Sequence, residues 1–211
     1  MNQEGEYVYV VDDDSTVREA LSSLLRANGK NVVLFSSGTE FLRYDRHDVA
    51  ACLLLDLNMP EMNGLEVQKF VAANTAIPIV FITGVGDIPS TVKAMKGGAA
   101  DFLTKPVDES ALLGAIETAL HKDRTQRLQA LENAELVERY ESLTPREKEV
   151  LPLLAAGLLN KVIAADLGIT EYTVQVHRGN IMRKMDADSF AHLVRFAGVV
   201  CPAPAPEVTK K

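Results

Sequence analysis

The front half of the chain alternates short apolar runs with stretches of helical spacing. The apolar runs lie at Tyr7–Val11, Asn31–Phe35, Ala51–Leu55, Ile77–Ile82 and Asp101–Thr104. The strongest runs are rich in Val, Ile and Phe and show no apolar–polar alternation, as is typical of strands buried on both faces of a parallel sheet. Five such strands alternating with five helices predict a doubly wound α/β fold with a five-stranded parallel sheet.

The stretches between the strands carry apolar residues three or four positions apart, which predicts amphipathic helices. The first helix has its apolar face at Val17, Leu21 and Leu25, and Asn28-Gly29 ends it. Further helices are predicted after the turn at residues 60–64, from Pro89 to Gly97-Gly98, and over residues 109–140.

Residues 109–140 form one long helix or two helices in line, because no proline or glycine interrupts residues 115–142. Leu128, Leu131 and Val137 stand there among Glu, Gln and Arg residues. This pattern fits a short coiled-coil seam or a solvated spacer, and too few heptads are present to choose between them. The domain boundaries that we predict are 1–122, a helical linker at 123–142, a second domain at 143–200 and a flexible tail at 201–211.

The second domain is predicted to be a small all-α domain of four helices. Thr144 and Glu147 form a capping-box pattern around Pro145, and the first helix runs to Ala156-Gly157. Asn160 is predicted to cap a helix that ends at Leu167, and Thr170 a longer helix that ends near Met185. These two helices have the spacing of a helix-turn-helix, and a last helix covers about residues 189–197.

Composition is that of an ordinary globular protein, with 47% hydrophobic and 24% charged residues. No apolar run reaches the roughly 18 residues of a membrane span, and the first residues do not resemble a secretory signal. Cys52 and Cys201 make no disulfide framework, which favours a reducing cytoplasm. Residues 1–122 carry a net charge of −7 and residues 143–211 one of +2, so the two domains are expected to have different partners.

Polar residues follow four of the predicted strands, at the sheet edge where such folds bind ligands. These are Asp12-Asp13-Asp14, Asp56, Thr83-Gly84 and Lys105-Pro106. Crowded carboxylates repel one another and need a cation, and oxygen ligands suit Mg²⁺. Lys105 and Thr83 are suited to hold an anion. Together these groups predict phosphoryl transfer to Asp56.

The motifs Val10–Asp14, Leu54–Gly64, Ile82–Gly84 and Phe102–Pro106 resemble those of a two-component response regulator of the FixJ/NarL type. The resemblance implies a flavodoxin-like receiver domain over residues 6–121. It makes Asp56 the phosphoacceptor. For the metal, it implies that Asp13, Asp56 and the backbone carbonyl of Asn58 bind Mg²⁺ (or Mn²⁺) and that Asp12 holds a metal-bound water. For the phosphoryl group, it implies that Thr83 and Lys105 bind the oxygens and that Asn58 and Val85 influence its lifetime. Phe102 would be the switch aromatic, and the Lys105–Pro106 peptide would be cis. Asp14 is predicted to be a helix cap instead.

Residues 143–197 resemble a LuxR-type DNA-binding domain, through Leu143–Leu151, the segment around Asn160-Lys161 and Thr173–Ile181. Carried over by position, Gln175 and Val176 face base edges, while Lys161, Thr173, His177 and Arg178 are candidates for phosphate contacts. Two residues depart from the pattern. Pro152 is predicted to kink the first helix, and Gly179 weakens the recognition helix and removes a side chain from it.

The function that these resemblances imply is a phosphorylation-dependent transcriptional regulator and not an enzyme in its own right. A sensor histidine kinase is expected to phosphorylate Asp56. A face that includes Met95, Phe102 and Lys105 then pairs two copies on double-stranded promoter DNA, with RNA polymerase as a further candidate partner and no membrane. Two alternatives remain. In the first, the chain is a haloacid-dehalogenase-type phosphatase, whose signature Asp12 and Asp14 also fit. In the second, the chain is a DNA-binding protein whose receiver domain is only a passive dimerisation module.

Overall fold

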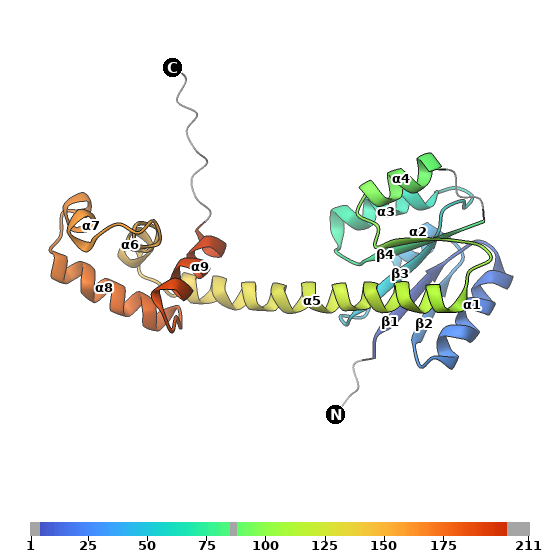
Figure 1. Cartoon of the computed structure of the whole chain (residues 1–211), viewed down its shortest axis with the longest axis horizontal. Helices are drawn as coiled ribbons and strands as arrows, with labels where there is room; N and C mark the ends of the chain where they lie inside the picture. The colour runs from blue at the N-terminus through green and yellow to red at the C-terminus, as the bar shows by residue number, and fades with distance from the viewer. Residues whose placement is uncertain (1–4, 85–87, 202–211) are drawn as a thin grey trace, which may run out of the picture. The chain divides into compact units, whose positions relative to one another are not determined.

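The structure, a computed structural model, describes residues 5–84 and 88–201 of the chain. The chain divides into two compact units, residues 1–128 and 129–211. Figure 1 shows the sheet with its helices in the first unit and the small helices of the second. The first unit therefore ends inside the predicted linker.

The sheet of the first unit has five parallel strands in the order β2-β1-β3-β4-β5. The strands are β1 (Tyr7–Val11), β2 (Asn31–Phe35), β3 (Ala51–Asp56), β4 (Ile79–Thr83) and β5 (Asp101–Thr104). This is the predicted fold class. The fourth strand was predicted two residues too early. Pro78 has no N–H for the ladder, so it serves only as the acceptor for Leu53 N–H just before the strand.

Helices cover both faces of this sheet (Figure 1). They are α1 (Ser15–Ala27), α2 (Gly38–Arg43), α3 (Gly64–Asn74), α4 (Ile88–Lys96) and α5 (Glu109–Glu141). One core contains Tyr9 and Val11 of β1 with residues of α2, α3 and α4, and the other contains Val8 and Val10 with residues of α1 and α5. Successive residues of β1 thus point to opposite faces, and both faces are buried, which is why the strand shows no alternation.

The second unit contains α6 (Pro145–Ala155), α7 (Asn160–Leu167), α8 (Glu171–Lys184) and α9 (Phe190–Val200) around one apolar core. Thr144 and Glu147 form the predicted capping box, and Gly168 takes the left-handed conformation between α7 and α8. Pro152 lies on the exposed side of α6, and the helix continues past it to Ala155.

Two predictions for the second unit need correction. Asn160 is the first residue of α7 and not its cap; Leu159 holds the cap position and supplies no side-chain hydrogen bond. The last helix continues beyond Ala197 to Val200, because its apolar residues go on packing against the core. Cys201 follows as the C-cap and also packs there.

All but the last residue of the predicted linker lies in α5, whose two ends have different surroundings. Asp123 is buried in the first unit, and Leu136 is buried near the other end of the helix. Leu128 and Leu131 between them are exposed. In the described part of the chain, no helix is both long and apolar enough to cross a membrane.

Candidate functional site

The predicted site residues lie at the carboxyl ends of β1, β3, β4 and β5. The register pairs Val11 with Leu55, Asp56 with Ile82, and Thr83 with Thr104. Parallel strands in this register carry Asp12, Asp56, Thr83 and Lys105 to one edge of the sheet. β1 and β3 are also the strands between which the chain order reverses, where ligands bind in such folds.

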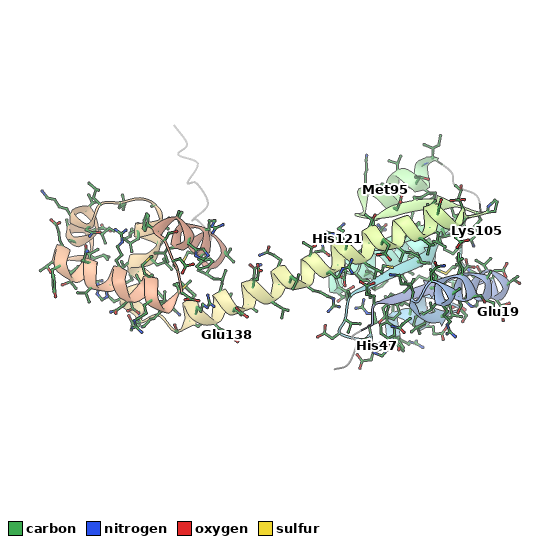
Figure 2. The ribbon with its side chains drawn as sticks, turned by 60° about the horizontal axis from the view of Figure 1, so that its bottom comes forward. Glu19, His47, Met95, Lys105, His121 and Glu138 are labelled. Atoms are coloured by element: carbon green, nitrogen blue, oxygen red, sulfur yellow. The ribbon has the colours of Figure 1, made fainter. Side chains whose placement is uncertain are left out.

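Lys105 bridges the two central carboxylates. Its Nζ lies 2.6 Å from Asp12 Oδ2 and 2.9 Å from Asp56 Oδ1. Asp12 and Asp56 are 2% and 5% exposed, so one ammonium group compensates two buried carboxylates. In Figure 2, Lys105 lies at the end of the first unit where α5 begins. The geometry joins residues 93 positions apart in a single charged cluster.

The electrostatics of the cluster favour a cation beside these carboxylates. Burial raises the pKa of Asp12 above its usual range, against the opposing hydrogen bonds from Lys105 and from Asp14 N–H. Burial disfavours the ammonium of Lys105, but its hydrogen bonds to Asp12 and Asp56 outweigh this and raise its pKa. An unpaired charge at this edge of the sheet would therefore cost folding free energy, whereas a paired one does not carry that cost in full.

Backbone N–H groups orient both carboxylates, and Asp12 Oδ1 accepts from Asp14 N–H at 3.0 Å. Asp56 Oδ2 accepts from Asn58 N–H at 2.7 Å, and Asn58 Nδ2 donates to Thr83 Oγ1 at 3.3 Å. On the other side, Arg18 Nη1 donates to the backbone carbonyl of Asp12 at 2.6 Å. Arg18 was not predicted as a site residue. The available signal was its place in the second turn of α1, six residues after Asp12.

Asp13 and Asp14 lie beside Asp12 but are exposed. Asp14 is the N-cap of α1, and its Oδ1 accepts from Thr16 N–H at 2.8 Å. This hydrogen bond holds the pKa of Asp14 below its usual range. The predicted role of Asp14 as a helix cap is confirmed.

The donor set at this edge suits a hard cation. Asp12 and Asp56 present carboxylate oxygens around one ammonium group, and Asn58 adds a backbone carbonyl nearby in sequence. Oxygen ligands and retained waters are what Mg²⁺ prefers. Across residues 5–84 and 88–201, no three Asp, Glu, His or Cys side chains converge as a complete metal-binding group. The residues fit a cation held by two carboxylates, with Asp13 exposed at the rim.

Thr83 and Phe102 lie on adjacent strands at this edge. Thr83 is fully buried, and Phe102 is half-buried with its ring centroid 6.3 Å from that of Phe81. The Lys105–Pro106 peptide is cis. Val85, which was predicted to influence the lifetime of a phosphoryl group, lies outside the described residues.

The predicted DNA-contacting residues lie on α7 and α8. Lys161, Gln175 and Val176 are exposed, whereas Thr173, His177 and Arg178 are half-buried. Thr173 Oγ1 lies 2.9 Å from the cap hydroxyl of Thr170, and the guanidinium of Arg178 lies 4.6 Å from the centre of the Phe190 ring. These two polar groups already have partners within the unit.

Two further exposed residues near the starts of these helices were not predicted. Tyr172, in the first turn of α8, is 78% exposed, and Leu159, just before α7, is 73% exposed. The sequence places both residues near predicted helix starts, but it does not reveal their exposure, which depends on how the helices pack.

Comparisons with known proteins fit both units. Residues 8–117 match the response regulator receiver domain, and residues 141–197 match the luxR family of bacterial regulatory proteins.

Similar proteins match the chain over nearly its whole length. Response regulator protein TmoT of Ectopseudomonas mendocina is 51% identical over 92% of this chain and 89% of its own length. Transcriptional regulatory protein FixJ of Azorhizobium caulinodans is 42% identical over 96% of each chain. Among solved structures, the response regulator StyR matches with a TM-score of 0.77 and 48% identity, over 92% of this chain and 98% of that one.

Proposed function

The chain belongs to the two-component response regulators that carry a LuxR-type DNA-binding domain, and we propose that phosphorylation of Asp56 switches its dimerisation and promoter binding. The observation that carries the proposal is the bridge from Lys105 to Asp12 and Asp56 at the strand ends. It places a nucleophilic carboxylate, a cation and a second acid in contact. The sensor kinase, the DNA and this chain would meet in the bacterial cytoplasm.

In the proposed reaction, a carboxylate oxygen of Asp56 attacks the phosphorus of a phosphohistidine on the sensor kinase. The new O–P bond forms as the N–P bond breaks, and the imidazole leaves with the bonding electron pair and takes up a proton. Lys105 is placed to neutralise negative charge on the transferred group. A Mg²⁺ ion at Asp13, Asp56 and the Asn58 carbonyl, with Asp12 holding one of its waters, would neutralise further charge there.

Phosphorylation changes the contacts of the residues around Asp56. The phosphoryl group adds about −1.5 to −2 charges and three strong acceptor oxygens. The nearby donors are Lys105 Nζ, directly after β5, and the hydroxyl of Thr83, the last residue of β4. A Thr83 hydroxyl that turns to the phosphoryl group would give up its bond from Asn58 Nδ2 and leave space for Phe102 to move inward.

The proposed dimer forms through α4, β5 and α5. On α4, Ile88, Val92 and Met95 are 80%, 44% and 45% exposed. Their spacing of four and three residues places them on one side of the helix, and Met95 is labelled there in Figure 2. An exposed apolar stripe of this kind suits a second copy of the chain. Pairing would bring two recognition helices to half-sites on promoter DNA, with RNA polymerase as a further partner.

Intact-mass spectrometry tests the phosphoacceptor. The wild-type chain and Asp56→Asn are incubated with Mg²⁺ and acetyl phosphate. A gain of one phosphoryl group in the wild type alone is the expected result. A gain in both proteins would move the acceptor to another residue, with Asp12 the first to examine. A gain in neither would indicate either an acceptor closed to small phosphodonors or a receiver that is a passive dimerisation module.

Light scattering under the same conditions tests the switch. The wild type is expected to dimerise on addition of the phosphodonor, and Asp56→Asn to stay monomeric. Val92→Asp, which leaves the phosphoacceptor intact, should gain phosphate without dimerising. An Asp56→Asn variant that still dimerised on phosphodonor addition would contradict the mechanism.

The phosphatase alternative predicts many turnovers on a phosphate ester and no stable label on Asp56. It requires Asp14 as a general acid or base. In the structure the Asp14 carboxylate instead caps α1, and this alternative gives the second unit no role.

A further inference from the structure

A solvent-exposed hydrogen bond joins the two helices of the helix-turn-helix through two side-chain amides. Asn160 Nδ2 donates to Gln175 Oε1 at 3.0 Å. Asn160 is the first residue of α7, and Gln175 lies in the second turn of α8. Because Asn160 does not cap α7, its side-chain amide is available for this bond.

The backbones that carry the two amides are held by the core beneath them. Ile163 on α7 and Val174 on α8 are both fully buried in the same apolar cluster. Thr170 caps α8 and fixes where that helix begins. The distance between the Asn160 and Gln175 backbones is therefore set by packing. The hydrogen bond between the two side-chain amides then fixes the orientation of the flexible Gln175 side chain.

We propose that Asn160 is a positioning residue that orients the amide of Gln175 for reading a base. This rests on the proposed DNA contact of Gln175. The Asn160 amide occupies one lone pair of Gln175 Oε1, so the second lone pair and both Nε2 hydrogens remain. An outward amide with one acceptor and a donor matches the N6 and N7 atoms of adenine.

The exposure of this hydrogen bond, with Gln175 exposed and Asn160 half-buried, indicates a role in recognition. Gln175 is exposed, so water competes with the bond in the free protein and the bond contributes little to folding. When DNA covers α8, water leaves and the same bond strengthens. The bond also removes rotamer freedom that Gln175 would otherwise lose on binding.

The test uses the full-length chain treated with Mg²⁺ and acetyl phosphate, and a library of randomised double-stranded DNA. Bound sequences are compared for the wild type, Asn160→Ala, Gln175→Ala and the double variant. Gln175→Ala identifies the base pair that Gln175 reads. Asn160→Ala should lower discrimination at that same base pair about five- to tenfold. In the double variant, loss of Asn160 should have no additional effect at that base pair.

Two further variants separate positioning from general effects. Asn160→Asp has only acceptor oxygens, so it should bind Gln175 Nε2, turn Oε1 outward and shift the preference from adenine towards cytosine, whose N4 is a donor. Lys161→Ala, next to Asn160, should weaken binding to all sequences equally.

Unchanged discrimination at that base pair in both Asn160 variants would overturn the inference while leaving DNA binding intact. So would a Gln175→Ala variant with the wild-type preferences. A wild-type chain that enriches no sequence would instead overturn the proposed DNA-binding function, and the inference with it.

Discussion

The carboxylate of Asp123 accepts a hydrogen bond from the backbone N–H of Ala51, with the two atoms 2.9 Å apart. Ala51 begins β3, the strand that ends in the proposed phosphoacceptor, whereas Asp123 is the first residue of the predicted linker. Arg127 Nε lies 2.8 Å from the same carboxylate, and its Nη1 lies 2.6 Å from Asp48 Oδ1. The receiver unit therefore uses helix residues beyond the boundary at residue 122.

Asp123→Ala should destabilise the receiver unit by about 2–3 kcal/mol, because it leaves the buried N–H of Ala51 without its acceptor. Urea unfolding followed by circular dichroism measures this change. Asp48→Ala is the matched control: it removes the other carboxylate bound to Arg127, but that side chain is 99% exposed, so its loss should cost about 0–1 kcal/mol. Equal effects of the two variants would contradict the structural role of Asp123.

Lys105→Met should raise the affinity for Mg²⁺ about tenfold while reducing phosphorylation of Asp56. The ammonium group occupies the carboxylate oxygens that the metal needs, and removing its charge strengthens their attraction for another cation. Calorimetric titration with MgCl₂ measures the affinity. Lys105→Arg keeps the charge and should stay near the wild type. Weaker Mg²⁺ binding by Lys105→Met would show that Lys105 does not compete with the metal.

Gly64→Ala should destabilise the receiver unit by more than about 2 kcal/mol and slow phosphorylation of Asp56. A Cβ at Gly64 would lie 2.5 Å from the backbone oxygen of Asp56 and 2.9 Å from the Phe81 ring, so the phosphoacceptor strand must shift. Gly114→Ala in α5 meets open space and should instead stabilise by about 0.5–1 kcal/mol. Thermal unfolding ranks the two variants, and the reverse order would refute this packing argument.

The stability of the second unit should fall in acid through Glu147. Burial of Glu147 opposes its ionisation, but hydrogen bonds from Lys184 and from Thr144 outweigh this and hold its pKa below its ordinary value of 4.5. Since the pKa is lower in the folded state, the stabilisation is complete above pH 4.5 and is lost as the pH falls through the folded-state pKa.

Glu147→Gln retains an oxygen that can accept from Thr144 N–H but has no charge for Lys184. It should be about 1–3 kcal/mol less stable near pH 7 and lose less stability on acidification than the wild type. Hydrogen exchange of peptides from residues 143–200 measures this unit within the full chain. Parallel acid profiles for the two proteins would show that Glu147 does not carry the pH dependence.

Gly179→Ala should stabilise α8 by about 1 kcal/mol, because Gly179 lies inside the helix and an added Cβ meets open space. The same hydrogen-exchange measurement reports it. Slower exchange confined to peptides of α8 and its neighbours is the expected result. Faster exchange would mean that the added methyl group disturbs a contact that glycine allows.

Much of this architecture follows from the sequence because it depends on local patterns. Unbroken apolar runs marked the central strands β1, β3 and β4, since both of their faces are buried. Capping residues such as Thr144 and Asp14 marked helix starts through side-chain bonds to nearby backbone N–H groups. Helix α2 was harder to place because it has only six residues and almost no periodicity.

Tertiary structure decided which polar groups meet. The sequence determined that Asp12, Asp56, Thr83 and Lys105 follow strands, because each directly follows or ends an apolar run. The bridge from Lys105 to both carboxylates depends on strand order, which brings together residues far apart in the chain. Asn160 donates a hydrogen bond to Gln175 instead of capping a helix, and this likewise depends on the packing of α7 against α8. Local patterns determine elements, whereas side-chain partners across elements depend on distances that only the folded chain sets.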